Sequence, residues 1–441
     1  MKLTGWAGYP QHNAKMISPV SVSEIRKKLK EGNLIARGNG RSYGDSAISK
    51  SNTVSMKNFN KIISFDNNNG ILVAESGILL ADIIKNFLPQ GWFPYVTPGS
   101  KYVTLGGMVA ADVHGKNHHK EGNFGKYVSW IEIIDCIGSI KKCSVNENSE
   151  LFHWTIGGMG LTGVILRVAI KLRKVESPWI KQNTLFADDL NEVIDIFEKN
   201  MDATYSVAWI DCLKKNKNQG RSIVFLGEHA NLSDLNIYRK KMTMNANKKK
   251  FSISIPFYFP NWFMKQRLIK CFNFFYYWNQ KLKNSKRLVD WDSFFYPLDS
   301  IKGWNKIYGK KGFLQFQCVI PIDKSREGIK YLLDEVSKSE VGSFLSVIKR
   351  FGKQEGNFSF PMEGYTLNLD FPINEKSLEL VNRLDQITIN FKGRFYLAKD
   401  SRMKLETFLK SDDRIKNFLL FREKQNLSKS FNSVQSNRLG L

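Results

Sequence analysis

The chain has 441 residues, of which 42% are hydrophobic, and a formal net charge of +25. Single hydrophobic cores rarely grow beyond roughly 250–300 residues, so this length predicts two domains, and the apolar content excludes a wholly disordered chain. The positive charge indicates either a lysine-rich solvated surface or an anionic partner, such as a phosphorylated substrate, anionic lipid or nucleic acid.

The first third of the chain mixes helix and strand signals. Ser21 and Glu24 have the spacing of a helix cap before an amphipathic helix that includes Ile25 and Leu29. A short buried strand over 34–37 then runs into glycines. Further elements follow in chain order, namely strands over 53–56, 61–65 and 71–75 and a helix over 80–88 that ends before Pro89.

The next region alternates glycine-rich loops with strands. Glycines are dense over 97–125 and again over 157–160, and a strand with a hairpin is expected between them at 130–140. A strand over 164–172 follows. Because the glycine loops end near 174–178, we predict a domain boundary there.

The segment 248–287 combines clustered lysines with many aromatic residues. Two interpretations stay open. The segment forms an ordinary amphipathic helix whose aromatic face packs in the core, or it touches a membrane surface, with aromatic rings at headgroup level and lysines on anionic lipid.

The five cysteines form no CxxC pair, so neither a disulfide framework nor a zinc site is expected. Reduced thiols favour a cytoplasmic protein. Residues 1–16 hold Trp6 and Pro10 where a signal peptide needs an apolar run, and no stretch approaches ~18 continuous apolar residues. We therefore expect no membrane-spanning segment.

Two glycine-rich loops are the strongest candidates for a binding site. The loop over 38–44 follows a strand, and its glycines let backbone N–H groups approach an anion such as a diphosphate, although a tight turn would need the same residues. It lacks the GxGxxG spacing of a Rossmann fold and the lysine of a Walker motif. The region over 97–119 is the second, and the two would enclose an extended cofactor if they converged.

Three histidines in the second region suggest a metal site. His118 and His119 are adjacent, however, and would point apart on a strand, and no carboxylate follows His114 or either of them at ligand spacing. We expect no bound metal.

These motifs recur with others in a specific order over roughly residues 5–441, apart from a divergent segment near 215–290. The order resembles the vanillyl-alcohol oxidase type of FAD-binding protein. Within that type, the chain is similar to the family of the oxidase subunit of decaprenylphosphoryl-ribose 2'-epimerase. The motifs that carry this resemblance are the two glycine loops, Gly158-Met159-Gly160-Leu161-Thr162-Gly163, His114-Gly115-Lys116-Asn117-His118-His119, Phe295-Tyr296-Pro297-Leu298-Asp299, Gly312-Phe313-Leu314-Gln315-Phe316-Gln317, Asp370-Phe371-Pro372-Ile373 and Ala398-Lys399-Asp400-Ser401-Arg402.

The resemblance implies an α+β fold of two domains with the active site between them. An FAD-binding domain of the PCMH type would cover 1–177. A substrate-binding domain over 178–392 would be built on an antiparallel sheet with helices on one face, and residues 393–441 would return to the FAD domain.

The implied cofactor is FAD, bound without a covalent bond. Many members of the wider superfamily attach the flavin through a histidine in the first glycine loop, and Arg41 stands at that position here. The implied cofactor-binding residues are Gly38, Asn39, Gly40, Arg41, Ser42, Tyr43, Gly99, Ser100, Thr104, Gly106, Gly107, Ala110, His114, Gly115, Asn117, Val164, Ile165, Tyr396 and Lys399.

The implied chemistry is transfer of a hydride from a carbinol carbon to flavin N5. Lys399, His114 and Tyr43 are the candidates that would handle the hydroxyl proton, and Lys399 would also stabilise negative charge on the reduced flavin. Lys349 is a fourth catalytic candidate, which would meet a phosphate or a ring hydroxyl.

Six residues are implied to bind the substrate. Gln315 and Gln317 alternate with Phe316, so both amides would face one side of a strand, where they suit sugar hydroxyls. Asn368 stands where mycobacterial relatives have a cysteine, so cysteine-directed covalent inhibitors are expected to fail. The full set is Phe295, Tyr296, Gln315, Gln317, Lys349 and Asn368.

Three functions are compatible with these features. The first is oxidation of the C2' hydroxyl of a polyprenyl-phosphate-linked pentose to a keto sugar, which a separate NAD(P)H-dependent short-chain reductase would reduce, on an enzyme associated peripherally with the inner face of the plasma membrane. The second is an FAD-dependent sugar-lactone or alditol oxidase with a soluble substrate. The third is a basic nucleic-acid-binding protein that uses aromatic stacking. It leaves the glycine loops unexplained, so we expect no nucleic-acid partner.

Overall fold

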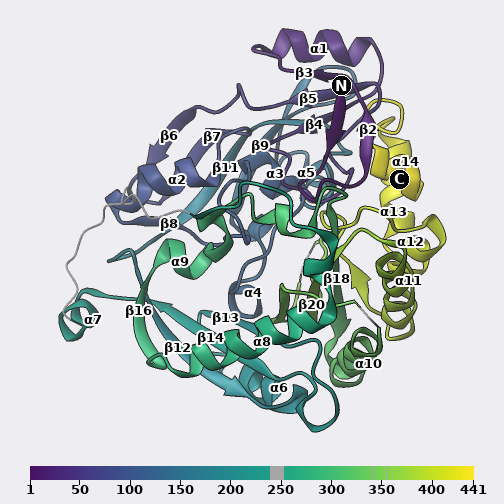
Figure 1. Cartoon of the computed structure of the whole chain (residues 1–441). Helices are drawn as coiled ribbons and strands as arrows, with labels where there is room; N and C mark the ends of the chain where they lie inside the picture. The colour runs from purple at the N-terminus through teal and green to yellow at the C-terminus, as the bar shows by residue number, and fades with distance from the viewer. Residues whose placement is uncertain (239–252, 340, 355) are drawn as a thin grey trace.

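The computed structural model describes residues 1–238, 253–339, 341–354 and 356–441. Figure 1 shows an N-terminal unit (purple and blue), a second unit below it (teal and green), and C-terminal helices (yellow) that pack along the side of both. None of the helices that the structure describes combines the length and apolarity needed to cross a bilayer. The five cysteines, all of which lie within the described residues, are unpaired.

The N-terminal unit contains two main sheets. Apolar strand residues such as Leu34, Ile35 and Val54 are fully buried in the first sheet, which is parallel. Its strand order is β3 (Met16–Ile17), β5 (Asn52–Ser55) and β4 (Leu34–Arg37). The second sheet is antiparallel, in the order β10 (Ile140–Ser144), β9 (Val128–Ile134), β11 (Val164–Lys174), β7 (Ile71–Glu75) and β6 (Ile62–Asp66), with β8 (Trp92–Pro94) also on β11. A hairpin of β1 (Lys2–Thr4) and β2 (Gln11–Asn13) precedes both.

The helices of this unit begin and end where local sequence signals predict. The side chain of Ser21 accepts a hydrogen bond from the backbone N–H of Glu24 and caps α1 (Val22–Lys30), as expected. Helix α2 (Leu80–Phe87) ends just before Leu88 and Pro89, which form a short 3₁₀ turn. The remaining helices are α3 (Leu105–Ala110), α4 (His118–Glu121) and α5 (Ser149–Thr155). The predicted hairpin over 130–140 is β9 with β10.

The second unit is built on an eight-stranded antiparallel sheet, which confirms the fold class. The long strands β18 and β20 pair over nine residues, from Phe313 opposite Pro372 to Pro321 opposite Gly364. The strand order is β16 (Lys286–Asp290), β12 (Trp179–Ala187), β14 (Ser222–His229), β13 (Tyr205–Ile210), β19 (Ser346–Phe351), β20 (Gly364–Pro372), β18 (Phe313–Pro321) and β21 (Arg394–Phe395).

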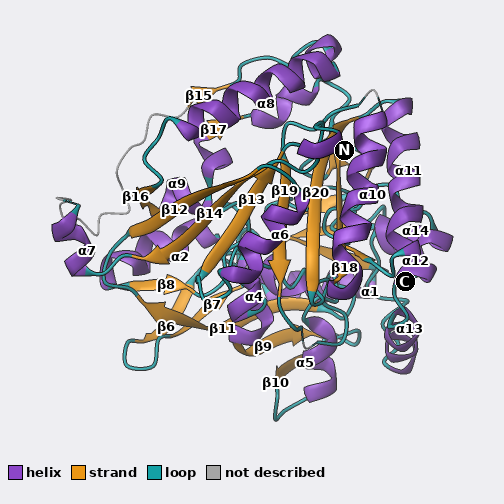
Figure 2. Ribbon diagram, turned by 90° about the horizontal axis from the view of Figure 1, so that it is seen from below, coloured by secondary structure: helices purple, strands orange, loops and turns teal. Residues whose placement is uncertain are grey.

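The two faces of this sheet are covered differently. Helices α6 (Leu190–Lys199), α10 (Ser325–Lys338) and α11 (Glu375–Asn390) lie against one face (Figure 2). Tyr365 of β20 points to that face, because its hydroxyl donates to the carbonyl of Ile194 in α6. Alternation along β20 therefore turns Thr366, Asn368 and Asp370 to the opposite face, which looks toward the N-terminal unit. Helices α8 (Gln266–Lys281) and α9 (Trp291–Phe295) lie on this second face; α7 (Leu232–Ile237) and the pair β15 (Ile253–Ser254) and β17 (Ile301–Lys302) complete the unit.

Helix α8 tests one of the two interpretations of the segment 248–287, that its aromatic face packs in the core. Ile269 and Tyr277 are buried, but Phe272, Phe275 and Trp278 are exposed, so the expectation that the aromatic face packs in the core is wrong for α8. Most of the aromatic side chains of this helix lie on its outer side. Residues 248–252 fall outside the described part of the chain.

The C-terminal tail ties the two units together. It starts with β21 in the sheet of the second unit and continues through α12 (Leu405–Ser411), α13 (Ile415–Lys424) and α14 (Val434–Leu439). The carbonyl of Ala398 accepts from the backbone N–H of Tyr43 at 2.9 Å. Arg438 of α14 pairs with Asp45 at 2.8 Å and with Asp400 at 2.9 Å. The division into domains at 177 and 392 stays a prediction.

We expect Arg438→Gln to destabilise the protein, because it leaves the buried carboxylates of Asp45 and Asp400 without their cation. Removing one partner from a buried ion pair costs about 3–5 kcal/mol. Arg326→Gln is the matched control, since Arg326 and Asp195 form a pair in which both side chains are 49% exposed. Exposed pairs contribute about 0–1 kcal/mol. Denaturant unfolding of both variants measures the difference, and equal losses would contradict the role given to the tail.

Candidate active site

The two glycine-rich loops converge, which is the condition under which they would enclose an extended cofactor. A Cβ added to Gly38, just after β4, would lie 2.0 Å from the hydroxyl oxygen of Thr104, which precedes α3. The side-chain amide of Asn39 donates to the carbonyl of Tyr102 at 2.8 Å. Glycine is therefore required at position 38 to let the loops meet.

Arg41 lies at the junction of these loops. Its guanidinium carbon is 4.0 Å from the centre of the Trp6 ring and 5.3 Å from that of Tyr102. Burial lowers the pKa of Arg41, and its Nε atom is buried without a hydrogen-bond partner among the described residues. A buried cation with an unused donor suits a diphosphate.

The second loop leaves open space beside its backbone. A Cβ added to Gly99 would meet nothing within 4 Å, and the neighbouring Ser100 is held by Asp299, whose carboxylate accepts from Ser100 Oγ at 2.9 Å. Gly106 is packed against Ser76, whose Oγ is buried and unpartnered within the described chain. An open glycine backbone, the buried Oγ of Ser76 and the cation of Arg41 together fit a dinucleotide cofactor.

Lys399 enters the site from the C-terminal tail. Its ammonium nitrogen lies 3.6 Å from the centre of the Tyr43 ring. Burial lowers the pKa of Lys399, the nearby Lys349 lowers it further, and the carboxylate of Asp370 opposes both effects. Three segments far apart in the sequence therefore set the charge of this lysine.

Asp370 on β20 is buried among polar partners. Gln315 on β18 donates its amide N–H to one carboxylate oxygen, and the hydroxyl of Tyr308 donates to the other at 3.4 Å. Burial raises the pKa of Asp370. The amide of Gln315 also reaches the hydroxyl of Tyr43 at 3.5 Å, so Asp370 is linked to the first glycine loop.

His114 lies near Lys399, whose charge contributes to lowering its pKa. The amide nitrogen of Gln317 is 3.1 Å from His114 Nε2, and in this orientation the amide donates, which leaves the ring proton on Nδ1. Nδ1 is buried without a hydrogen-bond partner in the described chain. Burial, assisted by Lys349, lowers the pKa of His114 well below its ordinary value, so the ring is neutral.

Two further lysines, both half-buried, complete the polar group. Burial lowers the pKa of Lys349 on β19 to about 8 and that of Lys116, just before α4, to about 7. Lys116 donates to the carbonyl of Phe294, and its ammonium lies 4.4 Å from the centre of that ring. Lys349 lowers the pKa of both Lys116 and Lys399, so its charge repels each of the other two. A bound anion would relieve that repulsion.

Three buried carbonyl oxygens on the same sheet face have no hydrogen-bond partner among the described residues. They belong to Gln315, Gln317 and Asn368. Leaving such an acceptor unpaired costs about 1–3 kcal/mol. Gln315 and Gln317 share a face as predicted from their spacing, and Asn368 lies opposite Gln317 in the register of β18 with β20. The arrangement offers acceptors to the hydroxyl groups of a ligand.

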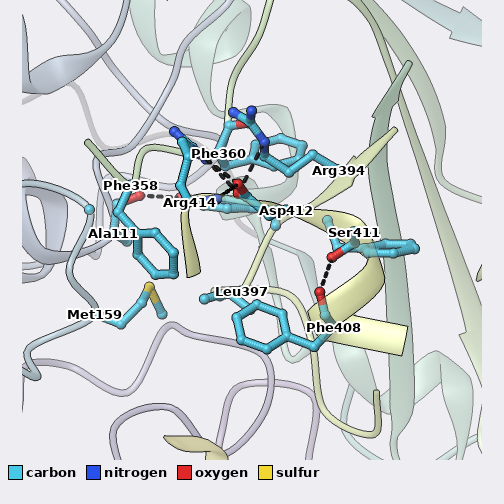
Figure 3. Close-up of a pocket in the computed structure, with 13 residues that line it drawn as sticks. Ala111, Met159, Phe358, Phe360, Arg394, Leu397, Phe408, Ser411, Asp412 and Arg414 are labelled. Atoms are coloured by element: carbon cyan, nitrogen blue, oxygen red, sulfur yellow. Dashed lines mark hydrogen bonds and ion pairs between the residues drawn. The ribbon is translucent and has the colours of Figure 1, made fainter. Parts of the chain in front are cut away.

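Two hollows border this group. One is lined by Gln315, Gln317, Tyr396 and Lys399 among others. The other is lined by Tyr396 and Leu397 among others. Figure 3 shows Arg394 and Arg414 converging on Asp412 there, at 3.2 and 2.6 Å. This ion cluster braces the start of the tail that carries Lys399.

The remaining candidates lie further from the polar group. Phe295 stacks on Phe93 at 5.4 Å and Tyr296 is buried beside it, so both belong to an aromatic cluster, and the Lys116 ammonium lies 6.0 Å from the centre of the Phe295 ring. Val164 and Ile165 lie on β11 beyond the end of its pairing with β7, which begins at Arg167. Asn117 bonds to the carbonyl of Tyr95 and to Glu121. The cofactor and substrate roles given to all these residues stay predictions.

His118 and His119 are not on a strand. They begin the short helix α4, where His118 bonds to Gln354 at 2.9 Å and His119 to the carbonyl of Ala203 at 2.7 Å. They do not lie on a strand because the chain turns at Lys116 and Asn117 and enters α4 directly afterwards. Within the described residues, no group of three or more potential ligand side chains could hold a metal ion.

Sequence reasoning did not assign two of the charged residues. Asp370 follows Asn368 at a spacing of two, so the alternation that places the amides would also have placed this carboxylate. Lys116 lies within the motif that starts at His114. Nothing in its local pattern distinguishes it from an exposed lysine.

The comparisons with known proteins agree with this geometry. A model of the FAD binding domain family matches residues 15–144. Decaprenylphosphoryl-beta-D-ribose oxidase of Mycolicibacterium smegmatis is 33% identical over 451 aligned residues, which cover 100% of this chain and 97% of that protein. The chain belongs to the decaprenylphosphoryl-β-D-ribose oxidase family. L-Gulonolactone oxidase of Bos taurus is 27% identical over 188 residues, 42% of each chain.

Membership of this family makes the chain an FAD-dependent oxidoreductase with a two-domain α+β fold of the vanillyl-alcohol oxidase type, as the sequence predicted. The matched FAD binding domain includes both converging glycine loops. Residues of those loops would hold the cofactor, with Arg41 at its charged part and Lys399, His114 and Tyr43 near its reacting end.

We expect Gly99→Ala to weaken FAD binding at least tenfold without destabilising the apoprotein. The added Cβ has open space in the protein alone, so a loss of affinity arises only if the cofactor occupies that space. Flavin fluorescence titration and thermal unfolding of the apoprotein measure the two quantities. Unchanged affinity would remove Gly99 from the cofactor site.

We expect Lys349→Met to stabilise the apoprotein at pH 7. Because burial lowers the pKa of Lys349 from 10.5 to about 8, the folded state favours the neutral amine. Burying Lys349 lowers stability least above pH 10.5, where the amine is neutral in the folded and the unfolded chain. The loss of stability grows as the pH falls to about 8, and below pH 8 it is on the order of 3 kcal/mol. Melting temperatures of the variant and the parent should therefore differ by several degrees at pH 7 and converge near pH 10.5.

The exposed neighbour Lys353 supplies the control, because Lys353→Met removes a solvated charge from the same region. A lower melting temperature for Lys349→Met than for the parent at pH 7 would contradict the account.

Proposed function

We propose that this enzyme oxidises the C2' hydroxyl of a polyprenyl-phosphate-linked pentose to a keto sugar. A separate NAD(P)H-dependent short-chain reductase would then reduce the product with inverted configuration, which completes an epimerisation. FAD, when bound, supplies the two-electron acceptor for the hydride. The relative from M. smegmatis that bears the name decaprenylphosphoryl-beta-D-ribose oxidase supports this substrate class.

The observation that carries the proposal is the chemistry of one sheet face. The unpaired acceptors of Gln315, Gln317 and Asn368 suit the hydroxyl groups of a sugar, and the half-buried cations nearby suit a phosphate. Neither feature is balanced within the described protein. A ligand that presents hydroxyls and a phosphodiester together satisfies both.

The proposed role of each residue follows from its position and charge. Lys349 and Lys116 hold the phosphate, since burial makes their charges costly until an anion arrives. Lys399 accepts the hydroxyl proton, because its lowered pKa makes the neutral amine accessible near neutral pH. His114, kept neutral and oriented by Gln317, presents its Nδ1–H to the sugar oxygen.

The alternative is a soluble sugar lactone or alditol, which the 27% identity to L-gulonolactone oxidase over 42% of the chain favours. It accounts for the sugar-facing amides but gives Lys116 and Lys349 no anion to bind.

Anaerobic mixing of the FAD-loaded enzyme with candidate substrates distinguishes the two. We expect a farnesylphosphoryl pentose to bleach the flavin absorbance, and lactones and alditols at the same concentration to leave it unchanged. Bleaching by the soluble compounds alone would overturn the proposed substrate class, and the aldehyde or ketone product identifies the carbon that is oxidised.

We expect Lys399→Met to slow flavin reduction by roughly 10²–10⁴-fold, the usual contribution of a positioned base. FAD remains bound, because the glycine loops are untouched. Stopped-flow reduction at saturating substrate measures the rate, and Lys353→Met serves as the control for loss of an exposed lysine. A variant that reduces its flavin at the parent rate would exclude Lys399 as the base.

A further inference from the structure

The side of helix α8 that faces the exterior is apolar. Ile269, Asn273 and Tyr277 recur every four residues and are buried. At 100° per residue, the opposite side of the helix is apolar as well, and Phe275 and Trp278 on it are 64% and 47% exposed. We define the α8 face as the exposed residues Leu268, Phe272, Phe274, Phe275, Trp278 and Leu282.

The body of the protein fixes this orientation. The amide of Asn273 donates to the carboxylate of Asp211 at 2.7 Å, and the hydroxyl of Tyr277 to that of Asp188 at 3.4 Å. Tyr276 packs on Trp209 of β13 at 5.0 Å. Because the inward side is anchored by polar and aromatic contacts, the exposure of the α8 face is built into the fold.

The aromatic surface continues beyond the helix. Ring contacts run from the exposed Phe257 to Phe259 at 5.5 Å, from Phe259 to Phe263 at 4.6 Å, from Phe263 to Phe344 at 6.0 Å, and from Phe344 to Phe272 at 5.2 Å. Figure 2 shows α8 with β15 and β17 at the outer edge of the molecule. Contiguous exposed aromatic surface of this kind is typical of a docking surface.

The charged residues in the sequence stretch that contains α8 are all basic. The sequence over 235–289 contains 13 lysines and arginines and no aspartate or glutamate, and so supplies more than half of the net charge of +25. In the described part of that stretch, six basic side chains beside the α8 face are exposed, namely Lys265, Arg267, Lys270, Lys281, Lys283 and Lys286. Aromatic rings beside several exposed cations match the interface of an anionic bilayer.

We propose that the α8 face docks the enzyme on the surface of an anionic lipid membrane. Phe275, Trp278 and Leu282 enter the headgroup region, and Lys270 and Lys281 meet the lipid phosphates. The uniform positive charge over a long acid-free stretch favours lipid over a protein partner, whose interface would mix charges of both signs.

The docking surface and the candidate active site share one face of the large sheet. Trp209, which packs against Tyr276 of α8, lies opposite Val347 on β19. Lys349 is two residues further along that strand. Alternation turns Trp209, Val347 and Lys349 to the same side. A membrane held by α8 therefore lies on the side of the sheet from which a membrane-anchored substrate would enter, although the docking itself does not depend on the proposed substrate.

The test is flotation of the FAD-loaded full chain with vesicles of phosphatidylcholine alone or with 30% phosphatidylglycerol, a composition of roughly one anionic lipid in three. The variants are Phe275→Ser with Trp278→Ser, and Lys270→Glu with Lys281→Glu. The controls are Tyr331→Ser, which removes an aromatic side chain that is 50% exposed on α10, and Lys57→Glu with Lys61→Glu, which reverse exposed charges of the N-terminal unit.

We expect the parent and both controls to float with anionic vesicles and each α8 variant to lose at least tenfold in the bound fraction, with FAD content and melting temperature unchanged. A parent that stays in solution with anionic vesicles overturns the proposal. So does equal binding of all variants, or dimerisation that depends on Phe275 and Trp278. Because the vesicles contain no substrate, these outcomes are independent of the flavin-bleaching experiment.

Discussion

The burial of Lys399 against the ring of Tyr43, within the field of Asp370, is the contact on which the candidate active site depends. A buried lysine is costly unless its charge is compensated. Here the compensation comes from a glycine loop of the first unit, a long strand of the second and the tail that joins them. The ion pairs of Arg438 hold the tail in place, so docking of the tail and assembly of the site are the same event.

The same sheet face carries more unpaired polar and charged groups than folding alone would require. Lys116 and Lys349 are partly desolvated, and no carboxylate raises their pKa. The side-chain carbonyls of Gln315, Gln317 and Asn368 are left without protein partners in the described chain. Each of these features lowers stability. Sites that recognise a ligand commonly carry such costs, because the ligand rather than the protein completes the hydrogen bonds and charges.

The sequence predicted most of this arrangement where the signal was local or periodic. The glycine loops, the cap at Ser21 and the shared face of Gln315 and Gln317 follow from rules that span a few residues. Lys399 is different, because in isolation it is one lysine among many, and only the resemblance to a family marked it. Its burial depends on a fold that brings position 399 to position 43, which no local pattern encodes.

Other features required the tertiary structure. His118 and His119 lie in a loop-to-helix turn whose direction the local sequence does not specify. The sequence of the segment containing α8 is compatible with an aromatic face that packs in the core or one that faces outward, since an amphipathic pattern does not specify which side faces the core. Asn273 and Tyr277 settle that point through their bonds to Asp211 and Asp188.

The central claim, that the flavin lies against Lys399 between the two units, is tested most directly by the reduction potential of the bound FAD. A cation beside the ring favours the negative charge that reduction creates. Spectroelectrochemical titration should therefore give a more negative potential for Lys399→Met than for the parent. Equal potentials in the two proteins, both with FAD bound, would contradict the account.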